Sequence, residues 1–380
     1  MTAEGVRQAP LLVAEGRVVD AFPPGTPFFT LRLLEHLVFP GLVNAHDHLT
    51  LNAIPPPART RIFPNSYEWI GAFQAHFSDP AVIAARSLPE RVRAFHGGLK
   101  NILAGTTTVA HHDPWSPDFD DPAFPVEVLR RYGWSHSLGL EEDYGPPVAS
   151  GYEATPKDMP WFIHLAEGTD SRAAAELERL DELGAFGENT LLVHGVGLTA
   201  DGMERVLSRG AGVVWCPASN LAVLGATLDP RRPADARRLA LGTDSRLSGS
   251  PDLLAELRVA AASSDLAPSE LLRLATVDAA RLLRLPDRAG LRPGKRADFI
   301  VLRDPGGAPA AALLRASRAD LRAIVRDGLP AVTDPDLAGW FDAAGIPVVP
   351  IRLDGRPKFC AARFLRLREA ADLEPGLEIP

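Results

Sequence analysis

The feature that most constrains the fold is an alternation, from residue 40 to residue 285, of short apolar stretches with longer stretches of helical spacing. The helix-like stretches cover residues 87–104, 122–132, 169–184, 199–209 and 250–285, and a charged stretch covers residues 230–238. The apolar stretches read as β-strands, because they are short and rich in β-branched residues: FPGLVNAH, TTTVAHH, GWSHSLGLE, WFIH, TLLVH, GVVWCP and LALGTD. Strands that alternate with helices predict βα units and a parallel sheet.

These strands are one short of the eight that close a (β/α)8 barrel. We place the gap in residues 141–160, EEDYGPPVASGYEATPKDMP, which are too few and too proline-rich for a full strand and helix. The pattern therefore predicts an α/β chain with a (β/α)8 TIM-type barrel in which one unit is truncated or irregular.

Both ends of the chain favour strands without intervening helices. Residues 1–38 alternate short apolar pieces (LLVA, RVVDAF, FFTLRLL) with turn residues, and GLRPGKRADFIVL and LRAIVRDGLPAV follow the last helices. We predict a composite β-sandwich and tail from residues 1–39 and 286–380, and a barrel from residues 40–285. A 380-residue chain suits this division, since single cores stop growing near ~250–300 residues.

Composition excludes several classes of partner. The net charge of -8 gives no electrostatic footprint for nucleic acid or an acidic membrane, and no apolar run approaches the roughly 18 residues of a membrane span. Two cysteines cannot form a disulfide framework, and the start MTAEGVRQAP lacks the features of a signal peptide. We expect a cytoplasmic protein that acts on a small molecule.

Histidine and aspartate residues stand at the ends of several predicted strands. Residues i and i+2 of a strand share a face, so His46 and His48 would both face the interior while the aspartate between them points away. Alone, this pair fits buried, hydrogen-bonded histidines equally well. However, His164, His194 and Asp244 end three later strands, and barrels gather strand ends at one mouth. Imidazoles with one carboxylate suit zinc or iron(II).

An acidic residue lies close to this predicted cluster. Glu167 comes three residues after His164, where the strand turns toward its helix. Partial burial beside a metal would hold its carboxyl pKa near neutrality and let it transfer a proton. The alternative is an acidic first-turn residue that the helix dipole favours.

Six short motifs and the tail together resemble one family, the amidohydrolase superfamily, within its branch of cytosine and guanine deaminases and triazine chlorohydrolases. The matching pieces are PGLVNAHDH, GTTTVAHH, HLAE, LLVHG, WCPASN, LGTDS and ATVDAARLLRLPDRAGLRPGKRADFIVL, which occur in family order over most of residues 10–303. The resemblance implies a metal-dependent hydrolase barrel with a β-sandwich from both termini. It also implies that one divalent metal binds His46, His48, His164 and Asp244, with Glu167 as proton shuttle and His194 as the orienting histidine.

The lysines favour a single metal. Binuclear members of the family use a carboxylated lysine on the fourth strand, and Lys157 is the only lysine near that place. Its surroundings, TPKDMP, do not read as a barrel strand. We therefore expect one ion, either zinc or iron(II).

The predicted activity is hydrolysis of a non-peptide C–N bond, as deamination or dechlorination of a heterocyclic or amidine-like molecule by a metal-bound hydroxide. Asp244 would accept the proton of the water, His194 would orient it, and Glu167 would protonate the leaving group. Two alternatives stay open: a ring-opening hydrolase of cyclic amides, and a non-catalytic metal-binding barrel. The resemblance also allows a homodimer.

Weaker candidates for substrate contact lie near the predicted mouth. Of two adjacent histidines, strand alternation turns one inward, and two tryptophans in or near loops could stack on a flat ring. An asparagine after a strand end could bind substrate or cap a helix. These candidates are His112, Trp69, Trp115 and Asn220. Two arginines in the loop after the first strand, Arg59 and Arg61, could meet an anionic substituent.

Overall fold

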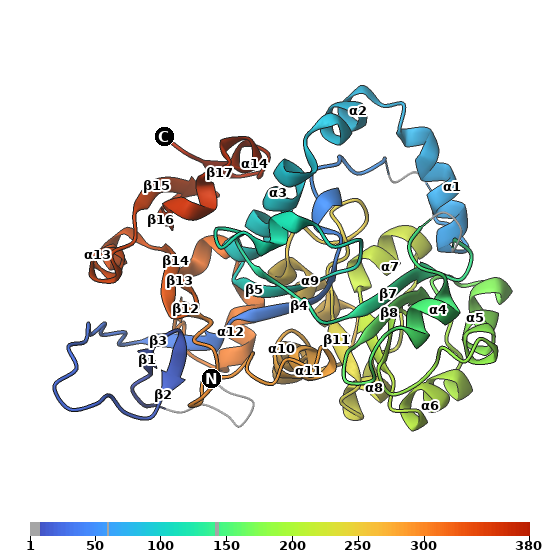
Figure 1. Cartoon of the computed structure of the whole chain (residues 1–380), viewed down its shortest axis with the longest axis horizontal. Helices are drawn as coiled ribbons and strands as arrows, with labels where there is room; N and C mark the ends of the chain where they lie inside the picture. Colours follow the sequence, from blue (N-terminus) through green and yellow to red (C-terminus); the bar gives the residue numbers. More distant parts are fainter. Residues whose placement is uncertain (1–7, 59–60, 141–143) are drawn as a thin grey trace.

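The structure is a computed structural model that describes residues 8–58, 61–140 and 144–380 (Figure 1). It contains α-helices packed around parallel strands in one part, and a mainly antiparallel sheet in another (Figure 1). Arg59 lies outside the described residues. No helix within the described ranges is long and apolar enough to cross a membrane.

Parallel strands follow one another through the middle of the chain, and they form a three-stranded and a five-stranded sheet. The first sheet has the order β4-β5-β6 and the second β11-β10-β9-β8-β7, with every neighbouring pair parallel. The strands are β4 (Leu42–Asp47), β5 (Thr106–His111), β6 (Glu127–Val128), β7 (Gly133–Ser137), β8 (Trp161–Leu165), β9 (Thr190–His194), β10 (Gly212–Trp215) and β11 (Leu239–Leu241). This sequential order confirms the predicted parallel α/β arrangement.

The carboxyl ends of the first and last of these strands are joined. The backbone N–H groups of Thr243 and Asp244 donate to the His46 carbonyl, at 3.0 and 3.1 Å. A Cβ on Gly242 would lie 2.7 Å from the His46 Cβ, so only glycine permits this approach. The segment after β11 is thereby held against the end of β4.

The prediction of a helix over residues 122–132 was wrong, because β6 lies there. Pro122 and Pro125 interrupt any helix in this stretch, and two residues of strand are too short to show an alternating pattern. A short 3-10 helix, Pro117–Asp120, replaces a crossover helix between β5 and β6. The βα unit that lacks a full helix therefore lies before β7, and not in residues 141–160 as predicted. The part of residues 141–160 that the structure describes contains α4 (Val148–Glu153).

Helices follow most of the parallel strands, and several begin at a side chain that caps their free N–H groups. At the starts of α5, α6 and α9, the side chains of Asp170, Thr199 and Asp252 each accept the backbone N–H of the residue three positions later. These helices and their neighbours are α1 (Ser66–His76), α2 (Pro80–Ser87), α3 (Glu90–Leu103), α5 (Ser171–Glu182), α6 (Ala200–Ser208), α7 (Pro217–Leu224), α8 (Arg231–Asp235), α9 (Leu253–Ala262), α10 (Pro268–Leu274) and α11 (Val277–Leu282).

Both chain ends enter one seven-stranded sheet, of order β17-β15-β16-β14-β13-β12-β3. Its strands are β3 (His36–Pro40), β12 (Phe299–Arg303), β13 (Leu321–Arg326), β14 (Leu329–Thr333), β15 (Val348–Leu353), β16 (Arg356–Ala361) and β17 (Leu377–Glu378). Strand β3 pairs antiparallel with β12, which joins residues more than 250 positions apart. A hairpin of β1 (Leu12–Ala14) and β2 (Arg17–Val19) lies beside it. The predicted strand over FFTLRLL is wrong, since residues 28–34 form none.

Three further short α-helices lie between or after the strands of this sheet in the last part of the chain. They are α12 (Pro309–Arg315), α13 (Gly339–Ala344) and α14 (Arg368–Asp372). Helix α14 packs against α3, so the end of the chain returns to the parallel-strand part (Figure 1).

Candidate active site at the strand ends

The predicted strand-end residues do converge. The Nε2 atoms of His46 and His164 are 3.4 Å apart, and Asp244 Oδ1 lies 3.9 Å from His46 Nε2 and 3.7 Å from His48 Nε2. Ligand atoms of His46, His48 and Asp244 form one group within 4.8 Å, and those of His46, His164 and His194 form another. All five side chains are buried.

Second hydrogen bonds orient two of these imidazole rings. His48 Nδ1 donates to Asp113 Oδ2 at 2.8 Å, and His164 Nδ1 donates to the His136 carbonyl at 2.9 Å. The Nε2 of His164 is therefore left with a lone pair that faces the cluster. Burial lowers the pKa of His48 but Asp113 raises it more, to about 9, so a metal ion would take the place of the proton on His48 Nε2. Burial lowers the pKa of His46 and of His164, which favours the neutral, ligating form. Three imidazole nitrogens this close to a carboxylate fit a divalent metal such as zinc.

Asp244 is fixed by a set of hydroxyl and backbone donors. Its Oδ2 accepts from Ser219 Oγ at 2.7 Å and from Ser248 Oγ at 2.9 Å, while Oδ1 accepts from the Ser245 N–H at 2.7 Å. Burial opposes its ionisation, but His48 and other groups lower the Asp244 pKa below its usual value. The carboxylate is therefore ionised, with Oδ1 facing the histidines.

The backbone is strained at three positions in the site. His194 has a φ of 75°, Asp244 a φ of 55° and Ala166, which precedes Glu167, a φ of 53°. These left-handed values cost about 1–3 kcal/mol each for non-glycine residues and persist only where the surroundings enforce them. Their gathering at the carboxyl strand ends marks the region where side chains are aimed at a function.

Glu167 and His194 form the second half of the site. Glu167 Oε1 lies 3.6 Å from His194 Nε2, and burial raises the pKa of the Glu167 carboxyl. His194 Nδ1 donates to Asn220 Oδ1 at 2.8 Å, and Asn220 Nδ2 donates to Thr227 Oγ1 at 3.2 Å. Asn220 thus fixes the His194 ring so that Nε2 faces Glu167.

The start of α1 holds the segment that carries Glu167. The Ser66 N–H donates to the Glu167 carbonyl at 2.9 Å. Glu176, on α5, accepts the Ala166 N–H at 2.6 Å and the Tyr67 hydroxyl. Burial raises the pKa of Glu176 to about 7. These bonds join the loop after β4 to the loop after β8.

Asp47 does point away from the histidine cluster, but it is the centre of a buried network that the pattern did not predict. Its Oδ2 lies 2.9 Å from Lys100 Nζ and 2.8 Å from Asn101 Nδ2, and its Oδ1 accepts from Asn52 Nδ2 at 2.9 Å. Lys100 Nζ also donates to Thr243 Oγ1 at 3.1 Å. The network therefore lies directly behind the residues adjacent to Asp244 and both β4 histidines.

The weaker candidates take different positions. His112 does face inward, with its ring stacked 4.3 Å from that of His164 and its Nε2 donating to the Ser135 carbonyl at 3.0 Å. Trp69 stacks on a neighbour in α1, and Trp115 packs edge-on against Phe119. Both polar atoms of the Asn220 side chain form hydrogen bonds, Oδ1 with His194 and Nδ2 with Thr227. Arg61 lies over the Phe63 ring, at 4.5 Å.

The four lysines all lie away from the cluster. Lys100 pairs with Asp47, and Lys157 Nζ lies 3.7 Å from the centre of the Tyr152 ring, before the start of β8. Lys295 donates to the Pro286 carbonyl, and Lys358 to the Leu321 carbonyl. This arrangement is that of a site without a bridging lysine.

The sequence pattern assigned no role to His136, which the structure places beside His164. The His136 ring lies 4.7 Å from the His164 ring and 5.3 Å from that of Tyr144, besides its carbonyl bond to His164. His136 is the fourth residue of β7, and its position on a strand preceding an irregular loop was the only available signal.

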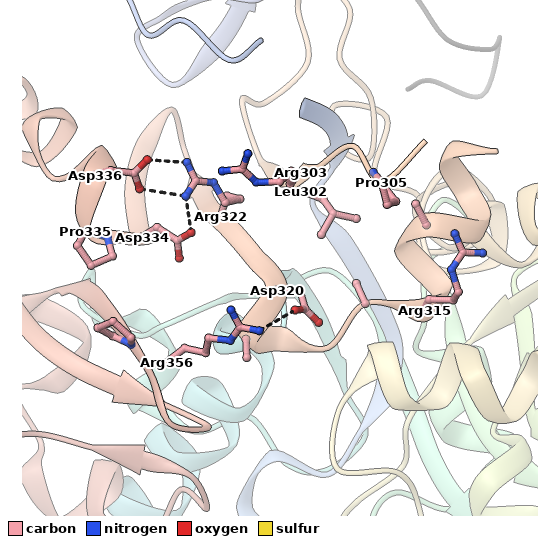
Figure 2. Close-up of a pocket in the computed structure, with 14 residues that line it drawn as sticks. Leu302, Arg303, Pro305, Arg315, Asp320, Arg322, Asp334, Pro335, Asp336 and Arg356 are labelled. Carbon is pink, nitrogen blue, oxygen red and sulfur yellow. Dashed lines mark hydrogen bonds and ion pairs between the residues drawn. The ribbon is translucent and has the colours of Figure 1, made fainter. Parts of the chain in front are cut away.

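A cavity of about 530 Å³ on the seven-stranded sheet is a separate feature (Figure 2). Figure 2 shows Arg322 bonded to Asp334 and Asp336, and Arg356 paired with Asp320. Since these charges already have partners and the cavity contains none of the strand-end residues, the reaction site lies elsewhere.

Comparisons with known proteins identify the family of the chain. The model of the Amidohydrolase family matches residues 143–334, half of the chain. A 5-methylthioadenosine/S-adenosylhomocysteine deaminase of Pyrococcus furiosus is 30% identical over 316 residues, which cover 70% of this chain and 75% of the relative. The chain belongs to the amidohydrolase family.

Other similar proteins of known activity extend this result. The 8-oxoguanine deaminase of Pseudomonas aeruginosa is 27% identical over 80% of this amidohydrolase and 83% of its own length. The structure of the atrazine chlorohydrolase of Arthrobacter aurescens complexed with zinc superimposes with a TM-score of 0.68, at 19% identity, over 85% of this chain and 90% of that one. The amidohydrolase is therefore a hydrolase that acts on C–N bonds, and its strand-end group is suited to a divalent metal.

Proposed function

We propose that this amidohydrolase removes an amino group, or an equivalent leaving group such as chloride, from a heterocyclic or amidine-like small molecule. The observation that carries the proposal is the convergence of three Nε2 atoms and Asp244 Oδ1 next to the Glu167–His194 pair. A single divalent ion, zinc or iron(II), would be held by His46, His48, His164 and Asp244. Such an ion lowers the pKa of a water molecule and so supplies a nucleophile at neutral pH.

The side chains divide the proton transfers between them. Asp244, ionised and held by Ser219 and Ser248, would accept the proton of the attacking water at Oδ1. His194, with its ring fixed by Asn220, would orient the water or the substrate through Nε2. Glu167, whose raised pKa favours the protonated acid, would donate that proton to the ring nitrogen or leaving amine.

The activities of the relatives and the positions of the lysines favour deamination over cyclic-amide ring opening. The relatives named above act on purine derivatives and a triazine, and the structure has no lysine at a bridging position among its four. We extend the proposal to the architecture: a (β/α)8 barrel over residues 40–285, with a β-sandwich from residues 1–39 and 286–380. Binding of substrate by His112, a homodimeric state and a cytoplasmic location also stay predictions.

A panel assay tests the activity. Metal-loaded protein should release ammonia from at least one purine, pyrimidine, triazine or amidine, and Asp244→Asn should lose that release while the variant keeps its fold. Consumption of a cyclic amide without ammonia would indicate ring opening instead. A folded protein that neither binds metal nor consumes any compound would indicate a non-catalytic barrel.

A further inference from the structure

A buried carboxylate near the end of the chain reaches the parallel-strand part of the molecule. Glu374 lies just after α14, and its side chain has no exposed area. Its Oε1 and Oε2 accept from Arg246 Nη2 and Nη1 at 2.8 and 2.9 Å. The pair is therefore bidentate, the strongest geometry for an arginine and a carboxylate.

A histidine and a second arginine complete the surroundings of this carboxylate. His96 Nε2, on α3, lies 3.0 Å from Glu374 Oε2, and Arg318 Nη1 donates to Oε1. Arg318 in turn donates to both oxygens of Asp354, at 2.9 Å each. Burial opposes ionisation of Glu374, but His96 and Arg246 lower its pKa well below the usual range. The carboxylate is charged and is bonded to groups from three elements.

Arg246 belongs to the Asp244 loop, which we define as residues 243–251. Its backbone N–H donates to Asn52 Oδ1 at 3.1 Å, and the same Asn52 amide donates to Asp47 Oδ1 at 2.9 Å. A continuous set of hydrogen bonds thus runs from Glu374 through Arg246 and Asn52 to Asp47, between the two β4 histidines. These bonds connect the end of the chain to the carboxyl ends of β4 and β11, where the predicted metal ligands lie.

The family match does not extend to this segment, because it ends at residue 334. Helix α14 nevertheless packs against α3 (Figure 1), and the bonds to Arg246 place Glu374 beside the Asp244 loop. We propose that Glu374 is a positioning residue for the active site: through Arg246 it holds the Asp244 loop in the conformation that aims Asp244 at the histidine cluster. This inference rests on the proposed function for the role of Asp244.

The test compares Glu374→Gln with Glu378→Gln, a control in the same segment whose carboxylate is exposed and pairs with Arg352 at 3.7 Å. Glutamine keeps the shape of Glu374 but removes its charge. We expect zinc affinity, measured by competition with a chelator, to fall about tenfold or more in Glu374→Gln, as for other groups that orient metal ligands. Amide exchange in the Asp244 loop should be faster, kcat should fall more than KM changes, and the control should match the wild type.

A second variant covers the case in which Glu374→Gln does not fold. Arg246→Lys keeps the positive charge but cannot form the bidentate pair, so it should show the same effects in weaker form. Zinc affinity and loop exchange equal to the wild type in either folded variant would overturn the proposal, even if thermal stability fell. Failure of the proposed function has a different signature: wild-type protein that binds zinc and releases no ammonia.

Discussion

Asp47 and Lys100 form an ion pair, 2.9 Å between Oδ2 and Nζ, in which neither side chain is exposed to solvent. The pair lies between the β4 strand and α3, directly behind His46 and His48. Taking two charges out of water costs several kcal/mol each, so the pair is retained only with good geometry and additional hydrogen bonds, which Asn52, Asn101 and Thr243 provide. It supports β4 from the side opposite the histidine cluster.

Removing one charge of this pair should destabilise the protein. Asp47→Asn leaves Lys100 buried without a counter-charge, so the free energy of unfolding should fall by about 3–5 kcal/mol. Adding Lys100→Met removes the stranded charge, and the double variant should lose less than Asp47→Asn alone. Urea denaturation of Asp47→Asn, Lys100→Met and the double variant measures the three losses. A double variant whose loss equals the sum of the two single losses would show that the residues do not interact.

The bond from His194 to Asn220 should affect catalysis more than stability. Asn220→Ala frees His194 Nδ1, so the ring loses its fixed tautomer, and kcat should fall about 10–100-fold. Asn189→Ala is the matched control, since Asn189 is equally buried and donates to the Met159 carbonyl near the other end of β9. It should lower stability and leave kcat close to the wild type. Equal kcat in the two variants would refute a role for Asn220 in orienting His194.

Glu167→Gln should separate proton transfer from metal binding. The glutamine cannot donate a proton to the leaving group, so kcat should fall by about 10²–10⁴-fold while the metal content stays at the wild-type level. Because the raised pKa favours the acid form, wild-type kcat should decline as the pH rises through that pKa. The residual activity of the variant should lack this decline. A variant with wild-type kcat would rule out Glu167 as the general acid.

Glu176 should make stability depend on pH. Burial raises its pKa to about 7 from 4.5, so between these values the folded protein holds a proton that the unfolded chain releases. Its contribution to the free energy of unfolding is full below pH 4.5 and is lost as the pH rises to about 7, by about 3 kcal/mol. Glu176→Gln can still accept the Ala166 N–H but does not titrate. The stability difference between wild type and variant, from urea curves at pH 5 and pH 8, should shift accordingly; parallel profiles would contradict this.

Much of the parallel-strand arrangement could be predicted because its signals are local. Each strand from β7 to β11 is a short apolar run next to a helix-like stretch, and a histidine or aspartate at the carboxyl end has a defined direction once the strands are parallel. The convergence of His46, His164 and Asp244 followed from that rule alone. Strand β6 escaped prediction because two residues carry no period.

Interactions between distant residues account for what could not be predicted. Nothing in the sequence around Asp47 indicates that Lys100, more than fifty positions later, would neutralise it, and Glu374 meets Arg246 across 128 positions. Such pairs depend on how α3 and α14 pack. The sequence left the role of Asn220 open for the same reason. An asparagine after a strand can cap a helix, contact substrate or support another side chain such as His194.

We infer that the strand-end residues hold one divalent metal, which hydrolytic deamination requires. The most direct measurement combines elemental analysis of purified protein with ammonia release by the same preparation before chelation, after chelation and after addition of zinc. The prediction is about one ion per chain, loss of ammonia release on chelation and its return with zinc. Ammonia release that persists after the ion is removed, or protein that binds no divalent metal at all, would contradict it.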